Sequence, residues 1–112
     1  MTLLICRTCP RYDPRTTGQF GAAMAAAVAG SGIPVRNVHC LGGCPDHGVA
    51  AVDSPGKARV RFTGLDTTHA DALITATTAH HASPTGTPDD WPVPTDLTDH
   101  ISAVTLKRPP LA

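Results

Sequence analysis

Four cysteines are the residues of this chain whose type and spacing are best suited to chemistry. They form two close pairs in the pattern C-x2-C-x30-C-x3-C, made of Cys6, Cys9, Cys40 and Cys44. Cysteine thiolates are ligands of zinc and of iron–sulfur clusters, and four of them brought together repel one another unless a cation or cluster holds them. The pattern therefore predicts a metal or iron–sulfur site formed by all four cysteines.

Two expected strands position these pairs. Thr2–Cys6 is a short apolar run that ends at the first cysteine, and residues 34–39 form a second strand-like run just before Cys40. Between them we expect a helix that begins near Thr16 and reaches about Ala29. A strand–helix–strand unit is almost always right-handed, and its two parallel strands end at the same edge of the sheet. Both cysteine pairs are therefore expected at one edge.

The first pair, C-R-T-C at residues 6–9, also has the form of a thiol–disulfide oxidoreductase motif. In such enzymes the reactive thiol usually lies where a helix N-terminus lowers its pKa. Here Pro10 follows the pair directly, and Pro14 comes before the expected helix. A thiol-exchange role also leaves the second pair unexplained. A further alternative is that the four cysteines are unrelated small buried hydrophobic residues. Both remain alternatives to a metal site.

The spacing leaves zinc and a [2Fe–2S] cluster as two open choices. Tetracysteine zinc sites favour two tight C-x2-C turns, whereas the second pair here is C-x3-C with Gly42 and Gly43 between the ligands. Glycines let backbone N–H groups approach sulfur atoms closely. A [2Fe–2S] cluster needs two ligands on each iron, which two pairs on adjacent loops supply. His39 and His47 flank the second pair and are alternative ligands of a mixed site.

The rest of the chain supplies two more strands and a second helix. Residues 49–53 and 58–62 are β-prone runs joined by S-P-G-K, which predicts a hairpin. A cap at Asp66, or at one of the two threonines after it, starts a helix that reaches about His81. The element order β-α-β-β-β-α indicates an α/β fold of the thioredoxin-like kind, with a four-stranded mixed sheet and an irregular C-terminal tail.

We expect one domain with a C-terminal extension. Residues 1–83 form the thioredoxin-like domain that binds the metal or cluster, and residues 84–112 form an irregular extension packed on the same domain. Within the extension, residues 95–104 are expected to form one or two helical turns. Trp91 is expected to anchor the extension to the core, and the two histidines at 80–81 to complement the dipole at the end of the second helix.

Composition excludes several functional classes. Lys plus Arg is 9 and Asp plus Glu is 9, so the net charge is zero, and the basic footprint of a nucleic-acid binder or a polybasic membrane-surface segment is missing. No stretch approaches the ~18 apolar residues of a membrane span, and the run Leu3–Ile5 is too short for a signal peptide. We therefore expect a soluble cytoplasmic protein. In that reducing compartment, spaced cysteines more often bind metal than form structural disulfides.

Several segments of the sequence resemble a known family. They are CRTC near the N-terminus, GQFGAAMAAAV, VHCLGGCPDHGVAAV, PGKARVRF and a later WP, which together span about residues 3–92. These segments resemble a family of small bacterial predicted metal-binding proteins that is related to the thioredoxin-like [2Fe–2S] ferredoxins, with members often found near cobalamin-synthesis genes. The resemblance implies the ferredoxin variant of the thioredoxin-like fold. It also implies that Cys6, Cys9, Cys40 and Cys44 are cluster ligands, and it favours [2Fe–2S] over zinc.

The expected function is therefore that of a [2Fe–2S] protein that acts as a one-electron carrier or as the cluster-bearing partner of a larger enzyme. The expected partner is a redox protein or metalloenzyme, and a homodimer is a candidate assembly. No substrate pocket is evident from the sequence, so we do not expect an enzyme. The alternatives are a tetracysteine Zn²⁺-binding module in metal handling and a C-x2-C thiol oxidoreductase.

Overall fold

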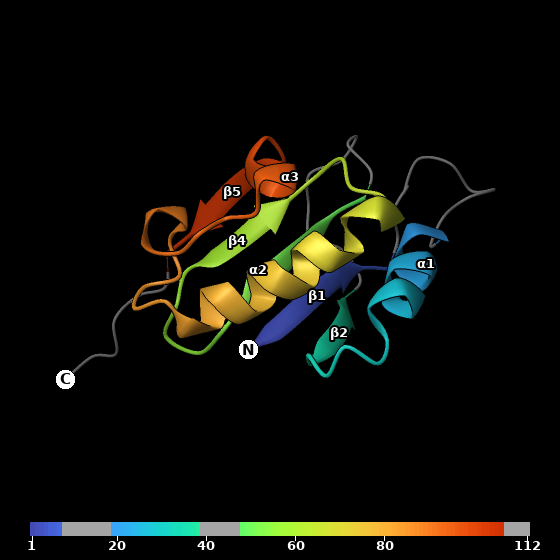
Figure 1. Ribbon diagram of the computed structural model, residues 1–112, viewed down its shortest axis with the longest axis horizontal. Coiled ribbons are helices and arrows are strands. Elements are labelled where there is room, and N and C mark those ends of the chain that lie inside the picture. Colours follow the sequence, from blue (N-terminus) through green and yellow to red (C-terminus); the bar gives the residue numbers. More distant parts are fainter. Residues whose placement is uncertain (8–18, 39–47, 107–112) are drawn as a thin grey trace.

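The fold is a mixed β-sheet with helices packed on one of its faces (Figure 1). The computed structural model describes residues 1–7, 19–38 and 48–106, and all statements on structure concern these residues. The elements are β1 (Thr2–Cys6), α1 (Gln19–Val28), β2 (Val35–Val38), β3 (Ala50–Asp53), β4 (Arg59–Phe62), the 3-10 turn η1 (Thr67–His69), α2 (Ala70–Ala82), the 3-10 turn η2 (Pro88–Asp90), α3 (Thr95–Thr98) and β5 (Ile101–Thr105).

The sheet has the strand order β2-β1-β3-β4-β5. β1 and β2 pair in parallel, with Cys6 opposite Val38, and the other neighbouring strands pair antiparallel. This arrangement confirms an α/β fold with a mixed sheet and the order β-α-β-β-β-α over the first two helices. The expected number of four strands is wrong, because β5 adds a fifth strand beside β4.

The core lies between the sheet and the helix layer. Alternate residues of the strands point to the same face of the sheet. α2 lies across this face in Figure 1, and buried residues of α1 and α3 pack into the same cluster. A buried cluster therefore joins the sheet to all three helices. Its members include Leu3, Ile5, Val52, Val60 and Phe62 from the strands, Met24 and Val28 from α1, Leu73 and Ala76 from α2, and Trp91 and Leu97 from the C-terminal region.

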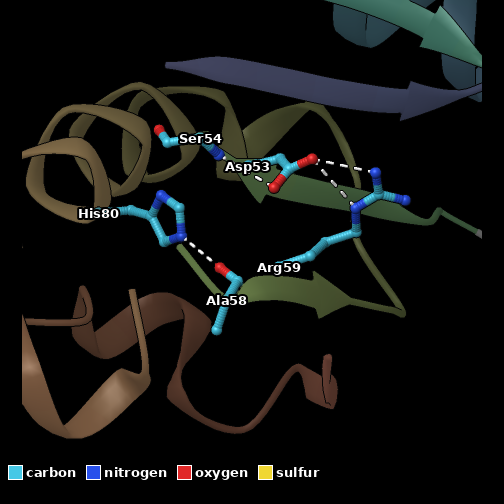
Figure 2. Close-up of polar contacts among 5 residues, drawn as sticks. All are labelled: Asp53, Ser54, Ala58, Arg59 and His80. Carbon is cyan, nitrogen blue, oxygen red and sulfur yellow. Dashed lines mark hydrogen bonds and ion pairs between the residues drawn. The ribbon is translucent and has the colours of Figure 1, made fainter. Parts of the chain in front are cut away.

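The turn between β3 and β4 confirms the expected hairpin. The backbone N–H of Lys57 donates to the carbonyl oxygen of Ser54 at 3.1 Å, and Gly56 has a φ of 74°. Proline followed by a residue with positive φ is the arrangement of a type II turn. Beside the turn, the guanidinium of Arg59 lies 3.0 Å from the carboxylate of Asp53 (Figure 2).

Asp66 caps the segment that leads into α2, as expected from the sequence. Its carboxylate accepts hydrogen bonds from the hydroxyl and from the backbone N–H of Thr68, the latter at 2.9 Å. These hydrogen bonds stabilise the ionised carboxylate, so they lower the pKa of Asp66 from its ordinary value. The backbone N–H of Asp66 in turn donates to Nδ1 of His69 at 3.0 Å, which completes a capping box.

The described part of the C-terminal tail, up to residue 106, forms regular elements, which corrects a second expectation. Residues 95–104 were expected to be helical, but the helix α3 ends at Thr98 and the chain then continues as β5. β5 pairs with β4 over Arg59 to Phe62, and Leu97 is fully buried. The described part of the extension therefore completes both the sheet and the core.

His80 also differs from the expected role at the helix end. Its side chain is fully buried, and Nε2 donates to the carbonyl oxygen of Ala58 at 2.6 Å (Figure 2). Trp91 packs edge-on against the His80 ring, with 5.8 Å between the ring centroids, and its indole N–H donates to the carbonyl oxygen of Gly86 at 2.9 Å. Trp91 thus anchors the C-terminal region to α2 and to the buried core, as expected.

We predict that Trp91→Phe lowers the free energy of unfolding by about 2 kcal/mol, because the Gly86 carbonyl loses its buried donor and the smaller ring leaves a gap. Urea unfolding followed by circular dichroism measures this difference, since Trp91 is the single tryptophan and its fluorescence is lost in the variant. An unchanged unfolding midpoint would show that Trp91 does not hold the extension in place.

None of the described helices has the length and the apolar composition that crossing a membrane requires.

Candidate metal centre

Cys6 is the one predicted ligand that lies within the described residues. It is the last residue of β1, and its exposed fraction is 1%. Its side chain packs with Val49 and with the partly buried ring of Phe20. The backbone N–H of Cys6 donates to the carbonyl oxygen of Val49 at 3.0 Å. The position of Cys6 is therefore set by β1 and by the segment that enters β3.

The ends of β1 and β2 lie at the same edge of the sheet, as the strand–helix–strand argument predicts. Cys6 is in register with Val38, the last residue of β2. The backbone N–H of Arg7 then donates to the carbonyl oxygen of Val38 at 2.7 Å. Cys9 follows Cys6 by three residues, and Cys40 follows Val38 by two. Both cysteine-bearing segments therefore leave the sheet from adjacent strands at this edge.

The segment that carries Cys9 also returns to this edge. It leaves after Arg7 and ends where α1 begins, at Gln19. Gly21, in the first turn of α1, packs directly on the end of β1, because a Cβ at this position would lie 2.7 Å from the carbonyl oxygen of Cys6. Glycine is therefore the residue that allows α1 to approach the β1 backbone this closely.

The segment that carries Cys40 and Cys44 returns to the same edge through Gly48. β3 runs antiparallel to β1, so its first residues lie beside the carboxyl end of β1. Gly48 has a φ of 76°, and a Cβ on it would lie 2.1 Å from the carbonyl oxygen of Leu65. The backbone N–H of Leu65 donates to the carbonyl oxygen of Gly48 at 3.0 Å. The end of this segment is thus packed tightly against the connection between β4 and η1.

The other predicted ligands lie outside the described residues. These are Cys9, Cys40 and Cys44, together with the alternative ligands His39 and His47. Among residues 1–7, 19–38 and 48–106, no three His, Cys, Asp or Glu side chains are grouped so as to hold a metal ion. Cys6 can therefore take part in a metal centre only with ligands from the two segments that begin beside it.

The donor set suits a thiophilic centre. Cys6 lies in apolar surroundings, where an isolated thiolate is disfavoured and a bound cation offsets its charge. The four predicted ligands are sulfur atoms, which suit zinc and [2Fe–2S] clusters, whereas Mg²⁺ and Ca²⁺ prefer oxygen ligands. A centre of this composition performs either structural binding or one-electron transfer.

Two histidines that the sequence analysis did not single out lie together near the start of β5. The rings of His69 and His100 are in edge contact, with 4.7 Å between their centroids. Nδ1 of His100 donates to the carbonyl oxygen of Thr63 at 2.8 Å, and Nδ1 of His69 accepts the capping hydrogen bond from Asp66. Both rings thus fasten the turn before β5 to the turn after β4. The D-x-x-H spacing of Asp66 and His69 is the sequence signal from which the capping role of His69 could be predicted.

Comparison with known proteins identifies a family. A family model described as "Protein of unknown function (DUF1636)" matches residues 3–110. No curated protein and no solved structure matches the chain. The family match covers both cysteine pairs and β5, whereas the likeness to thioredoxin-like ferredoxins rests on the sequence motifs alone.

Proposed function

The chain belongs to the DUF1636 family of proteins of unknown function, and from the architecture of its cysteine-bearing edge we propose that it is a [2Fe–2S] protein of the thioredoxin-like ferredoxin type. Cys6, Cys9, Cys40 and Cys44 would hold the cluster, two on each iron. The cluster would supply one-electron transfer, either to a free redox partner protein or within a larger metalloenzyme. The protein chain itself would bind the cluster, shield part of it from water and present it at one end of the sheet.

One observation carries this proposal: both cysteine-bearing segments begin and end at the same edge of the sheet. The first runs from Arg7 to α1, whose Gly21 contacts Cys6. The second runs from Val38, in register with Cys6, to Val49, which accepts a hydrogen bond from Cys6. Cys9 is two residues from Arg7 in the sequence, and Cys40 is two residues from Val38. The short reach of two residues from neighbouring strand ends favours a common site for the two pairs of thiolates.

The residues around Cys6 would also shield the proposed cluster from water. A sulfur ligand next to Val49 and Phe20 is shielded from water on that side, and low exposure is one of the features that set the potential of iron–sulfur centres. The backbone N–H of Cys6 is already used by Val49, and that of Arg7 by Val38. Any N–H donors to the cluster sulfurs would therefore come from other backbone groups.

Anaerobic purification followed by metal analysis and visible spectroscopy tests the proposal. We expect two irons and two acid-labile sulfides per chain, a red-brown colour, and an electron paramagnetic resonance signal that appears on one-electron reduction. Bound zinc without visible absorption would overturn the cluster proposal in favour of the zinc-binding module. A metal-free protein whose first two cysteines cycle between thiol and disulfide would identify a thiol oxidoreductase.

We also predict that removal of the metal lowers the melting temperature by roughly 10 °C or more. Binding free energy at a site between two segments is also folding free energy, and about 1 kcal/mol shifts Tm by roughly 4–8 °C in a domain near this size. Differential scanning calorimetry of the loaded protein and of the chelated, verified metal-free protein gives the difference. Equal melting temperatures would mean that the centre contributes nothing to the fold.

A further inference from the structure

The two edge strands of the sheet, β2 and β5, differ in the charge of their residues. β2 forms one edge and carries Arg36, with Pro34 just before the strand. β5 forms the other edge, and Ile101–Leu106 contains no charged residue. Edge strands of proteins that stay monomeric usually carry charges or prolines, which discourage pairing with another chain. β2 has such residues, and β5 lacks them over its whole length.

The exposed apolar side chains also gather at the β5 edge. Among the described residues, the large hydrophobic side chains that are exposed are Val35, with 37%, Val104, with 40%, and Leu106, with 72%. Val104 lies in β5 and Leu106 directly follows it, whereas Val35 lies alone in β2 beside Arg36. An uncharged strand with unpaired backbone groups and apolar side chains favours the addition of another strand.

We propose that two copies of this chain form a homodimer by pairing β5 with β5 in antiparallel orientation. The two five-stranded sheets then become one continuous sheet across a two-fold axis. The backbone groups on the outer side of each β5 find partners in the other copy. Because the strand is uncharged, no like charges meet within the new ladder.

The sequence on the two sides of β5 carries opposite charges, which favours a second copy in antiparallel orientation. Asp99 precedes the strand, and Lys107 and Arg108 follow it in the sequence. When two copies run antiparallel, the strand end that follows Asp99 comes beside the strand end that precedes Lys107 in the other copy, whereas parallel copies bring like ends together. The same pairing through β2 would bring the two Arg36 side chains close to each other.

This interface does not depend on the proposed metal centre. β3 and β4 lie between β1 and β5. Because neighbouring strands are about 4.8 Å apart, β5 lies on the order of 14 Å from β1, the strand that ends in Cys6. The dimer therefore leaves the carboxyl ends of β1 and β2, where the cysteine-bearing segments begin, accessible in both copies. It is expected with and without bound metal.

The test is the molar mass of the full chain in solution, measured by light scattering after size exclusion, for the wild type and two matched variants. Val104→Lys and Val35→Lys each place a charge on an edge strand at similar exposure, 40% and 37%. We expect a dimeric wild type, a dimer Kd raised by more than about tenfold in Val104→Lys, and an unchanged Kd in Val35→Lys. Circular dichroism shows that each variant is folded.

Leu106→Lys provides a second variant on the β5 side, since a side chain exposed by 72% contributes little to folding. It is also expected to weaken the dimer. A wild type that is monomeric at high micromolar concentration would overturn the proposal. So would a dimer that Val35→Lys disrupts and that Val104→Lys and Leu106→Lys leave intact, because this result would place the interface at β2.

Discussion

Replacement of Cys6 by serine is expected to abolish the proposed metal centre. Cys6 is buried at the end of β1, with its backbone N–H held by Val49, so a neighbouring residue cannot move into its place without a change in the strand. A serine hydroxyl is a poor ligand for iron and zinc compared with a thiolate. We expect the bound metal to fall from full occupancy to a small fraction, with loss of the visible spectrum.

Serine variants of Cys9, Cys40 and Cys44 are expected to lose or perturb the centre in the same way. His39→Ala and His47→Ala serve as matched controls, because both histidines flank the second cysteine pair and are not needed when four thiolates bind. Metal content and absorption spectra of the six variants decide the ligand set. A histidine variant without the centre, together with a cysteine variant of native spectrum, would refute the all-cysteine assignment.

The second large effect is expected at Gly48. Gly48→Ala places a Cβ at a φ of 76° and 2.1 Å from the carbonyl oxygen of Leu65, so the backbone of β3 or of the β4–η1 connection must shift. The positive φ costs about 1–3 kcal/mol and the overlap a further 1–3 kcal/mol. We therefore expect a loss of about 4 kcal/mol in the free energy of unfolding, a large part of the stability of a small domain.

Gly56→Ala is the matched control for this variant. Gly56 has a φ of 74°, close to that of Gly48, but a Cβ there would meet no atom within 4 Å. Its loss should be limited to about 1–2 kcal/mol for the left-handed backbone. Urea unfolding of both variants separates the cost of the conformation from the cost of the contact. Equal losses would show that Gly48 is not tightly packed against Leu65.

Gly48 also links stability to the proposed site. It directly follows the segment that carries Cys40 and Cys44, and its contact with Leu65 sets the place where that segment joins β3. Metal content in Gly48→Ala is therefore informative in addition to the unfolding data. In Gly56→Ala, which alters the turn at the opposite end of β3, metal content should stay normal.

Within the described part of residues 1–82, the sequence by itself determined most of the strands and helices. Local patterns predicted β1, β2, the β3–β4 hairpin and α2. The spacing of apolar residues and the turn residues Pro55 and Gly56 determine such elements through interactions between residues that are close in the sequence. The handedness rule placed the ends of β1 and β2 at one edge, and the register of Cys6 with Val38 confirms this. The four-cysteine ligand set stays a prediction, since three of its members lie outside the described residues.

Only the tertiary structure decided the C-terminal region. The residues of β5, I-S-A-V-T, follow a proline-rich stretch and have only a weak local preference for a strand. They form one because the backbone of β4 provides hydrogen-bonding partners along its length. The burial of His80 likewise depends on Ala58, 22 residues away, which accepts its hydrogen bond. Such contacts join segments that are distant along the chain, so their energy is absent from any local pattern and arises only when the sheet and α2 have formed.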